Sequence, residues 1–204
     1  MSTKYSSNII SLVKGLMEED QYKDLMGPPL KKEIIKKVES ITDTFPYKFD
    51  KDDRRYIGKV GRGVIDRDIK QTTDLKVSGL EGWEEEDQVL YDALKDGLND
   101  YVGHCINLHP AARLSSQFEV QDTGYQIQRY EPGDGYTWHH DAYETRRHTF
   151  IWYLNDIEDE GYTEFSTGLK VQPKAGRYLM FPALWPWKHR GYPPKSERKY
   201  IVTG

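Results

Sequence analysis

The chain has 204 residues, enough to bury a sizeable core, and we take residues 1–204 as a single domain. Its composition, 30% charged and 13% aromatic, excludes a disordered chain, and no apolar run reaches the roughly 18–20 residues of a membrane span. The formal net charge of −4 gives no overall attraction to nucleic acid, so we expect neither a nucleic-acid nor a membrane partner. Cys105 is the only cysteine, so any metal must be held by nitrogen and oxygen atoms.

The first part of the chain, residues 1–110, predicts a mainly helical support region. Helical spacing of apolar residues indicates helices over 5–16 and about 30–41, separated by a Gly-Pro-Pro break. The segment 46–68 is irregular, and 72–77 predicts a possible early strand. The clearest helix runs from Glu84 to about Leu108 and would brace the strands that follow. The N-terminus lacks the order of a secretory signal, so we expect a cytoplasmic protein, while the oligomeric state stays open.

After residue 110 the sequence changes to short runs rich in aromatic and β-branched residues, separated by Pro/Gly turns. The predicted strands are 125–130, 137–141, 148–154, 163–165, 177–181, 186–190 and 199–203. Closely spaced short strands are typical of a sandwich or barrel. With the preceding helix packed on one face, the sequence predicts an α+β fold whose chemistry lies in the C-terminal half.

The segment YTWHHDAYE places two adjacent histidines before an aspartate. Successive side chains of a strand point to opposite faces, so His139 and Asp141 share a face and His140 points away. A third ligand has to come from another strand: His148 follows too soon, whereas His189 comes after enough chain to cross the other sheet and return. Two histidines and one carboxylate form the facial triad that suits non-haem Fe(II). A lone His-x-Asp is also common as a surface hydrogen-bonded pair.

From about residue 124 to the C-terminus, the sequence resembles the prolyl 4-hydroxylase branch of the Fe(II)- and 2-oxoglutarate-dependent oxygenases. The matching segments fall in the family's order: Tyr-x-Pro-Gly before the His-x-Asp, Tyr-Leu-Asn, Gly-Tyr-Thr-Glu-Phe, Pro-Lys-Ala-Gly-Arg before Leu-Met-Phe, and a distal histidine followed nine or ten positions later by a basic residue. The resemblance implies a double-stranded β-helix, or jelly roll, as the catalytic core in residues 111–204, with N-terminal bracing helices. Residues 1–110 show no comparable signature.

The resemblance also implies roles for individual residues. His139, Asp141 and His189 would be the metal ligands and catalytic residues, with 2-oxoglutarate chelating Fe(II) through its 2-oxo acid end. Tyr153 matches a position where the family often has a hydroxyl on the far carboxylate of 2-oxoglutarate. Tyr130 matches the tyrosine that precedes Pro-Gly and lines the pocket. Core packing is the alternative for both tyrosines.

The far carboxylate of 2-oxoglutarate needs a cation inside an otherwise apolar barrel, because a buried unpaired charge is costly. Arg198 and Lys199 are the two candidates. Alternation puts Lys199, Ile201 and Thr203 on one face. Because the family commonly has a basic residue followed four positions later by a threonine at the cosubstrate, we favour Lys199, with Thr203 beside it, over Arg198.

The implied function is hydroxylation of an unactivated C–H bond, with a peptidyl proline as the leading substrate and succinate and CO2 as co-products. The implied cofactors are Fe(II), 2-oxoglutarate and O2, with ascorbate in support. The expected partner is a proline-containing peptide or protein, with Tyr136, Trp138, Tyr143 and Trp185 available at the rim. Three alternatives are an oxygenase acting on a non-prolyl or small-molecule substrate, a non-catalytic jelly-roll binding module, and a cupin-type hydrolase or isomerase. The cation-bearing strand RKYIVTG argues against the last.

Overall fold

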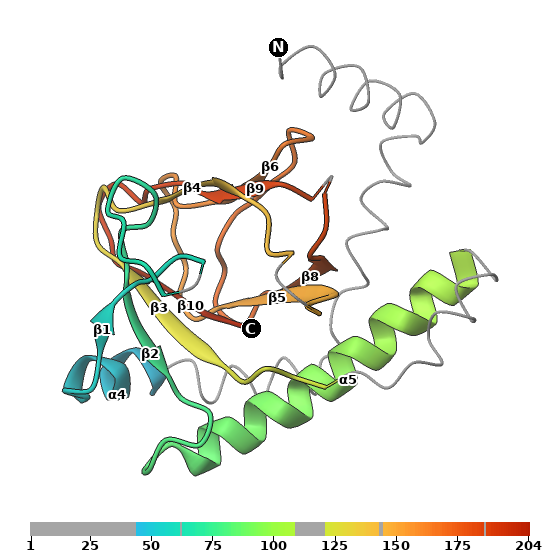
Figure 1. Ribbon diagram of the computed structural model, residues 1–204, viewed down its shortest axis with the longest axis horizontal. Helices are drawn as coiled ribbons and strands as arrows, with labels where there is room; N and C mark the ends of the chain where they lie inside the picture. The colour runs from blue at the N-terminus through green and yellow to red at the C-terminus, as the bar shows by residue number, and fades with distance from the viewer. Residues whose placement is uncertain (1–43, 62, 109–120, 143–144, 186) are drawn as a thin grey trace.

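The computed structural model describes residues 44–61, 63–108, 121–142, 145–185 and 187–204. In these ranges two antiparallel sheets face each other, and a long helix lies along the far side of the larger sheet (Figure 1). The larger sheet has six strands in the order β1-β2-β3-β10-β5-β8, and the smaller has four in the order β4-β9-β6-β7. None of the helices in the described ranges has the length and apolar character that crossing a membrane requires.

The strands are short, as the spacing of the turn residues predicts. The larger sheet consists of β1 (Tyr56–Ile57), β2 (Thr73–Lys76), β3 (Gln126–Tyr130), β10 (Lys199–Thr203), β5 (His148–Tyr153) and β8 (Tyr178–Pro182). The smaller sheet consists of β4 (Tyr136–His139), β9 (His189–Gly191), β6 (Thr163–Phe165) and β7 (Lys170–Val171). The described helices are α4 (Phe45–Lys51) and α5 (Glu84–Leu108).

Alternation along the strands of the larger sheet produces two different faces. On the outer face, Ile127, Trp152 and Val202 are fully buried in a cluster that includes Leu90 of α5. On the inner face, the side chains of β3, β5, β8 and β10 form a second cluster with Phe165 from the smaller sheet. The outer cluster fixes the helix, and the inner one holds the two sheets together around the site described below.

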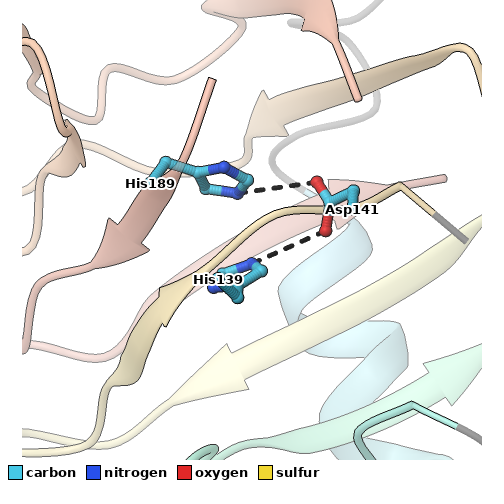
Figure 2. A group of neighbouring side chains, drawn as sticks. All are labelled: His139, Asp141 and His189. Atoms are coloured by element: carbon cyan, nitrogen blue, oxygen red, sulfur yellow. Dashed lines mark ion pairs between the residues drawn. The ribbon is translucent and has the colours of Figure 1, made fainter. Parts of the chain in front are cut away.

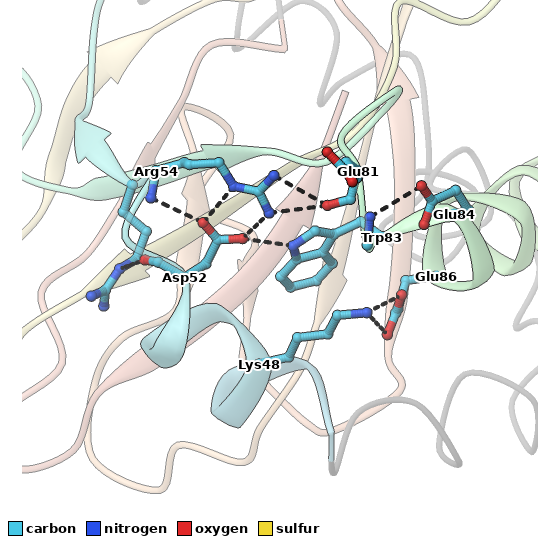
Figure 3. Close-up of polar contacts among 9 residues, drawn as sticks. Lys48, Asp52, Arg54, Glu81, Trp83, Glu84 and Glu86 are labelled. Carbon is cyan, nitrogen blue, oxygen red and sulfur yellow. Dashed lines mark hydrogen bonds and ion pairs between the residues drawn. The ribbon is translucent and has the colours of Figure 1, made fainter.

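Polar contacts fasten α4 to the start of α5 (Figure 3). The Lys48 ammonium pairs with Glu86 at 2.6 Å and lies 4.7 Å from the ring centroid of Trp83. The indole Nε1 of Trp83 donates to Asp52 at 2.9 Å, and Arg54 donates both to Asp52 and to the carbonyl oxygen of Glu81. These contacts hold together the two ends of the segment that carries β1 and β2.

Most of the predicted elements are present. The helix over Glu84–Leu108 and the strands 163–165 and 199–203 have the predicted bounds, and the α+β double-stranded β-helix is confirmed. Two strands around the candidate metal ligands are shorter than predicted, because β4 ends at His139 and β9 begins at His189. The prediction of an irregular segment over 46–68 is wrong where α4 and β1 form. The helices predicted over 5–16 and 30–41 lie outside the described residues.

Candidate metal and cosubstrate site

Neighbouring strands of the smaller sheet bring two histidines side by side. His139, the last residue of β4, is the register partner of His189, the first residue of β9. Asp141 lies between the two rings, with Oδ1 3.6 Å from Nε2 of His139 and Oδ2 3.5 Å from Nε2 of His189 (Figure 2). Asp141 lies in the chain after β4, which ends at His139. Alternation along the predicted strand 137–141 puts Asp141 on the same face as His139, and the two side chains do meet, although the strand ends two residues earlier than predicted. His140 does not join the group.

Both imidazoles are oriented by their own backbone. The Nδ1 atom of His139 lies 2.7 Å from the carbonyl oxygen of Thr137, and that of His189 lies 3.0 Å from the carbonyl oxygen of Trp187. A carbonyl oxygen only accepts hydrogen bonds, so Nδ1 carries the proton in each neutral ring and Nε2 presents a lone pair. This is the arrangement that a metal-binding histidine needs.

Tyr136 fixes the plane of the first histidine. Its ring stacks on that of His139, with centroids 3.5 Å apart and planes 12° from parallel. The pairing of β4 with β9 shifts register between these two residues, and such irregularities re-aim side chains near functional sites. Tyr136 also lines the cavity described below, whereas Trp138 packs beneath Arg190 on the opposite face of the sheet.

The charges in the group suit a cation. Burial, and then the neighbouring His189, lowers the pKa of His139 to about 4, so its ring is neutral at neutral pH. Burial raises the pKa of Asp141, but the two imidazoles outweigh this effect and hold it below the usual range. The set therefore offers two imidazole nitrogens and one carboxylate, all within 4.8 Å of one another. Metal–ligand bonds of about 2.1 Å put adjacent ligand atoms roughly 3–4 Å apart, so the three residues fit a facial set for Fe(II).

A cavity of about 550 Å³ extends from these three residues across the inner face of the larger sheet. Lys199 lies in its wall and is 1% exposed. Its ammonium donates to the carbonyl oxygens of Gly161 at 2.9 Å and Tyr192 at 3.3 Å, and it lies 4.2 Å from the ring centroid of Tyr130. No carboxylate of the described residues forms an ion pair with it, and burial lowers its pKa to about 7. A buried cation in this state fits a carboxylate ligand.

The two candidate anchors for that carboxylate point in opposite directions. Arg198 pairs with Glu131 at 2.9 Å and with Asp50 at 3.7 Å, and its side chain is 52% exposed. It does not line the cavity, because alternation turns it to the outer face of β10. Thr203 does line the cavity, with its hydroxyl donating to the carbonyl oxygen of Phe150.

The two predicted tyrosines differ in their access to the cavity. Tyr130 lines it and donates its hydroxyl to Gln128 at 3.0 Å. Tyr153 is fully buried and donates its hydroxyl to Thr163 at 2.7 Å, and it is Thr163 that lines the cavity. Burial raises the pKa of both phenols, so they are hydrogen-bond donors.

Several polar residues of the cavity were not predicted from the sequence. Lys70 and Asp74 form a buried ion pair at 2.7 Å, and the Lys70 ammonium lies 5.5 Å from the ring centroid of Tyr136. Gln128 and Gln126 continue a hydrogen-bonded row from Tyr130. The sequence does contain a sign of them. Alternation along the segment KQTTDLKV puts its charged residues on one face, where a strand facing an ordinary core would carry apolar side chains.

Known proteins resemble this chain in sequence and in fold. Residues 125–204 match the model of the 2OG-Fe(II) oxygenase superfamily. No curated protein matches the chain. The fold is similar to a prolyl hydroxylase from Trichoplax adhaerens, solved with a peptide fragment of the hypoxia inducible factor oxygen degradation domain. The TM-score is 0.66 at 16% identity, over 100% of this chain and 92% of that one.

Two further solved structures share the fold. A viral collagen prolyl hydroxylase from Paramecium Bursaria Chlorella virus-1, in its 2OG complex, has a TM-score of 0.55 and 20% identity over 81% of this chain and 88% of that one. A Pseudomonas putida prolyl-4-hydroxylase has a TM-score of 0.53 and 15% identity over 85% and 86%. At these identities the likeness establishes a prolyl hydroxylase-like fold. Residues 125–204, which carry the three candidate metal ligands, are similar to the 2OG-Fe(II) oxygenase superfamily.

Proposed function

We propose that the protein hydroxylates a peptidyl proline, with Fe(II) held by His139, Asp141 and His189 and with 2-oxoglutarate and O2 consumed to give succinate and CO2. The observation that supports this most directly is the meeting of the three side chains in the same cavity as a buried lysine that forms no ion pair with a carboxylate of the described residues. We also propose ascorbate as a supporting reductant and the cytoplasm as the site of action.

The residues of the chain have separate tasks in this proposal. Bound Fe(II), with 2-oxoglutarate and O2, supplies the oxidising chemistry that a protein side chain lacks. His139 and His189 would each hold the ion through an imidazole nitrogen and Asp141 through a carboxylate oxygen. Lys199 binds the far carboxylate of 2-oxoglutarate as a point charge, with its ammonium 4.2 Å from the ring centroid of Tyr130.

The cavity wall between the metal ligands and Lys199 limits access of water. Ile151 and Ile201 line it, and both are close to fully buried. An apolar wall strengthens the pairing between Lys199 and a carboxylate, because the effective dielectric constant is lower there than in water. The Tyr153 hydroxyl acts indirectly: it donates a hydrogen bond to Thr163 and so fixes Thr163 at the cavity surface.

A peptidyl proline is the substrate that the comparisons support best. Three solved structures with this fold are prolyl hydroxylases by name, and one of them was solved with a peptide fragment. The cavity is also larger than 2-oxoglutarate alone requires, at about 550 Å³, and leaves space for a side chain of a second molecule.

The test is incubation of the purified protein with Fe(II), 2-oxoglutarate, ascorbate and a panel of proline-containing peptides in air. We expect succinate formation that is stimulated by a peptide, and a product heavier by one oxygen at proline in tandem mass spectrometry. The same peptide with alanine in place of proline should be silent. An added oxygen at another residue would overturn the choice of proline, and no 2-oxoglutarate turnover with any peptide would overturn the proposed enzyme.

The cosubstrate assignment has a matched pair of variants. Lys199→Ala should raise the 2-oxoglutarate concentration for half-maximal succinate formation by about 100-fold, because it removes a buried charge-assisted contact. Arg198→Ala removes the neighbouring cation on the outer face and should leave that concentration within about two-fold of the wild-type value. The reverse order of effects would show that Arg198 is the anchor.

A further inference from the structure

The cavity has a strongly cationic wall. Among the described residues that line it, five are cationic and one, Asp141, is a carboxylate; the cations are Lys59, Lys70, Lys76, Arg146 and Lys199. The protein as a whole carries a formal net charge of −4. The charge of the cavity is thus opposite in sign to that of the molecule, and the two positive charges of Fe(II) increase the contrast.

Two of these cations already have a role. Lys199 is the proposed anchor of the cosubstrate, and Lys70 is neutralised by Asp74 at 2.7 Å, with both side chains almost fully buried. Lys59, Lys76 and Arg146 remain. None of these three forms an ion pair with a carboxylate of the described residues, although surface cations often do so where an acidic neighbour is available.

Two of the remaining cations, Lys59 and Lys76, lie at the exposed end of the cavity. Across the larger sheet, Lys199 pairs in register with Tyr130, whereas Lys76 pairs with Gln126, which in turn pairs with Thr203. Lys76 is therefore four residues along the strands from Lys199, roughly 13 Å at 3.3 Å per residue. The Lys199 end is closed, and Lys76 and Lys59 are exposed. Arg146 is half-buried and lines the same cavity as Asp141.

The open end of the cavity continues along the surface. A second cavity of about 380 Å³ adjoins it and shares Thr123, Arg146 and Gly204 with it. Its wall adds apolar side chains of α5, among them Leu94 and Leu98, with Lys95 beside them. The two cavities together are larger than a small metabolite fills. They suit an extended peptide that lies along both cavities, with Arg146 beside it where they meet.

We propose that the substrate is an acidic peptide segment, in which Asp or Glu residues next to the hydroxylated position bind Lys59, Lys76 and Arg146. This inference rests on the proposed function and specifies the substrate class of the same site. Carboxylates on the substrate would supply counter-ions that these cations do not find among the described residues. The positive cavity would also raise the association rate of acidic peptides and disfavour basic ones.

The test uses three peptides of equal length with a central proline, flanked by glutamate, glutamine or lysine. Binding is measured by calorimetry on the full chain loaded with Mn(II) and 2-oxoglutarate, so that no turnover occurs. At about 50 mM salt we expect the glutamate peptide to bind about 10-fold or more tightly than the glutamine peptide, and the lysine peptide to bind most weakly. Raising the salt to about 500 mM should reduce this preference several-fold.

Charge reversal separates recognition from a structural effect. Lys76→Glu, at an exposed position, should weaken binding of the glutamate peptide by about five-fold or more and strengthen binding of the lysine peptide. Lys51→Glu makes the same charge change on α4, outside the cavity, and should leave the order of the three peptides unchanged. A loss of packing would not swap the preference between two peptides.

Equal binding of the glutamate and glutamine peptides, no binding of either, or a glutamate preference that survives both Lys76→Glu and Arg146→Gln would overturn the inference. Failure of the proposed function is a separate result. If Fe(II) and 2-oxoglutarate give succinate but the peptides show no charge preference, only the acidic-substrate inference fails. If 2-oxoglutarate neither binds nor turns over, the proposed function fails.

Discussion

Lys199 has a side chain whose protonation is set by the fold. Its ammonium is fully buried, contacts two backbone carbonyl oxygens, and has a pKa of about 7 because burial disfavours the charged form. In the unfolded chain a lysine titrates near 10.4. At neutral pH the free protein is therefore a mixture of charged and neutral Lys199, and only the charged form attracts a carboxylate.

The affinity for 2-oxoglutarate should consequently fall with rising pH. Binding of the far carboxylate raises the pKa of Lys199, so the complex keeps a proton that the free protein loses above pH 7. We expect the dissociation constant measured by calorimetry with Mn(II) to be constant below about pH 6.5. It should increase by up to ten-fold per pH unit between about pH 7.5 and 9.

Lys199→Arg is the matched variant, because arginine stays protonated throughout this range. Its dissociation constant, whatever its value at pH 7, should be flat from pH 7 to 9. A wild-type constant that is equally flat would contradict the assignment of Lys199 as the anchor.

Chain order and alternation along the strands predict which side chains can meet, and the structure brings His139, Asp141 and His189 together, while their chemical roles stay predictions. Lys199 and Arg198 were separated because adjacent residues of a strand face opposite sides. The distal histidine was chosen over His148 by the chain length needed to return. The buried ion pair of Lys70 and Asp74 is not predicted from the sequence, because charged residues in a short polar strand are normally exposed. In the structure, the backbone of Gly58 covers this pair.

Asp74 of β2 pairs with Lys70, which precedes the strand and lines the cavity. Asp74 is fully buried, and burial raises its pKa against the effect of Lys70. Lys70 in turn contacts the Tyr136 ring that stacks on His139. The pair therefore connects the edge of the larger sheet with a candidate metal ligand of the smaller one.

Removing one partner of this pair should be more harmful than removing both. Asp74→Ala leaves the Lys70 ammonium buried without a counter-ion, and we expect it to lower the free energy of unfolding by about 3–5 kcal/mol in urea titrations. The double variant Lys70→Met/Asp74→Leu replaces both charges by apolar groups and should cost about 1–2 kcal/mol at most. A double variant that loses as much as Asp74→Ala would show that the uncompensated charge is not the cause.

The long helix and the longer strands were predictable because they repeat one pattern over enough residues. The helix α5 carries apolar residues at three- and four-residue intervals over 25 positions. The two-residue strands β1 and β7 are too short to show a repeating pattern of apolar and polar residues. They form because neighbouring strands pair with them. The seven-residue helix α4 is likewise held by contacts of Lys48 and Asp52 that are distant in sequence.

The two sheets contribute different parts of the site. His139 and His189 belong to the smaller sheet and Asp141 follows it, whereas Lys199 belongs to the larger sheet. A metal ion alone would therefore contact only side chains of the smaller sheet and of the chain directly after β4. A ligand that joins the metal to Lys199 would connect both sheets.

Metal and 2-oxoglutarate should consequently stabilise the protein together more than separately. At 100 times its dissociation constant a ligand adds about 2.7 kcal/mol, and for a chain of this size each kcal/mol raises Tm by about 2–4 °C. In thermal unfolding we expect a rise with Mn(II), no rise with 2-oxoglutarate alone, and a further rise of about 5–10 °C with both. Lys199→Met should abolish only the further rise. A full effect of 2-oxoglutarate without metal would contradict a cosubstrate that depends on the metal.

The most direct test of the whole account is anaerobic calorimetric titration of the protein with Fe(II). The wild-type protein should bind one ion, His189→Ala and Asp141→Ala should each weaken binding by about 100-fold or more, and His140→Ala should behave as wild type. Retention of wild-type affinity in His189→Ala, or its loss in His140→Ala, would show that the three side chains do not hold the metal.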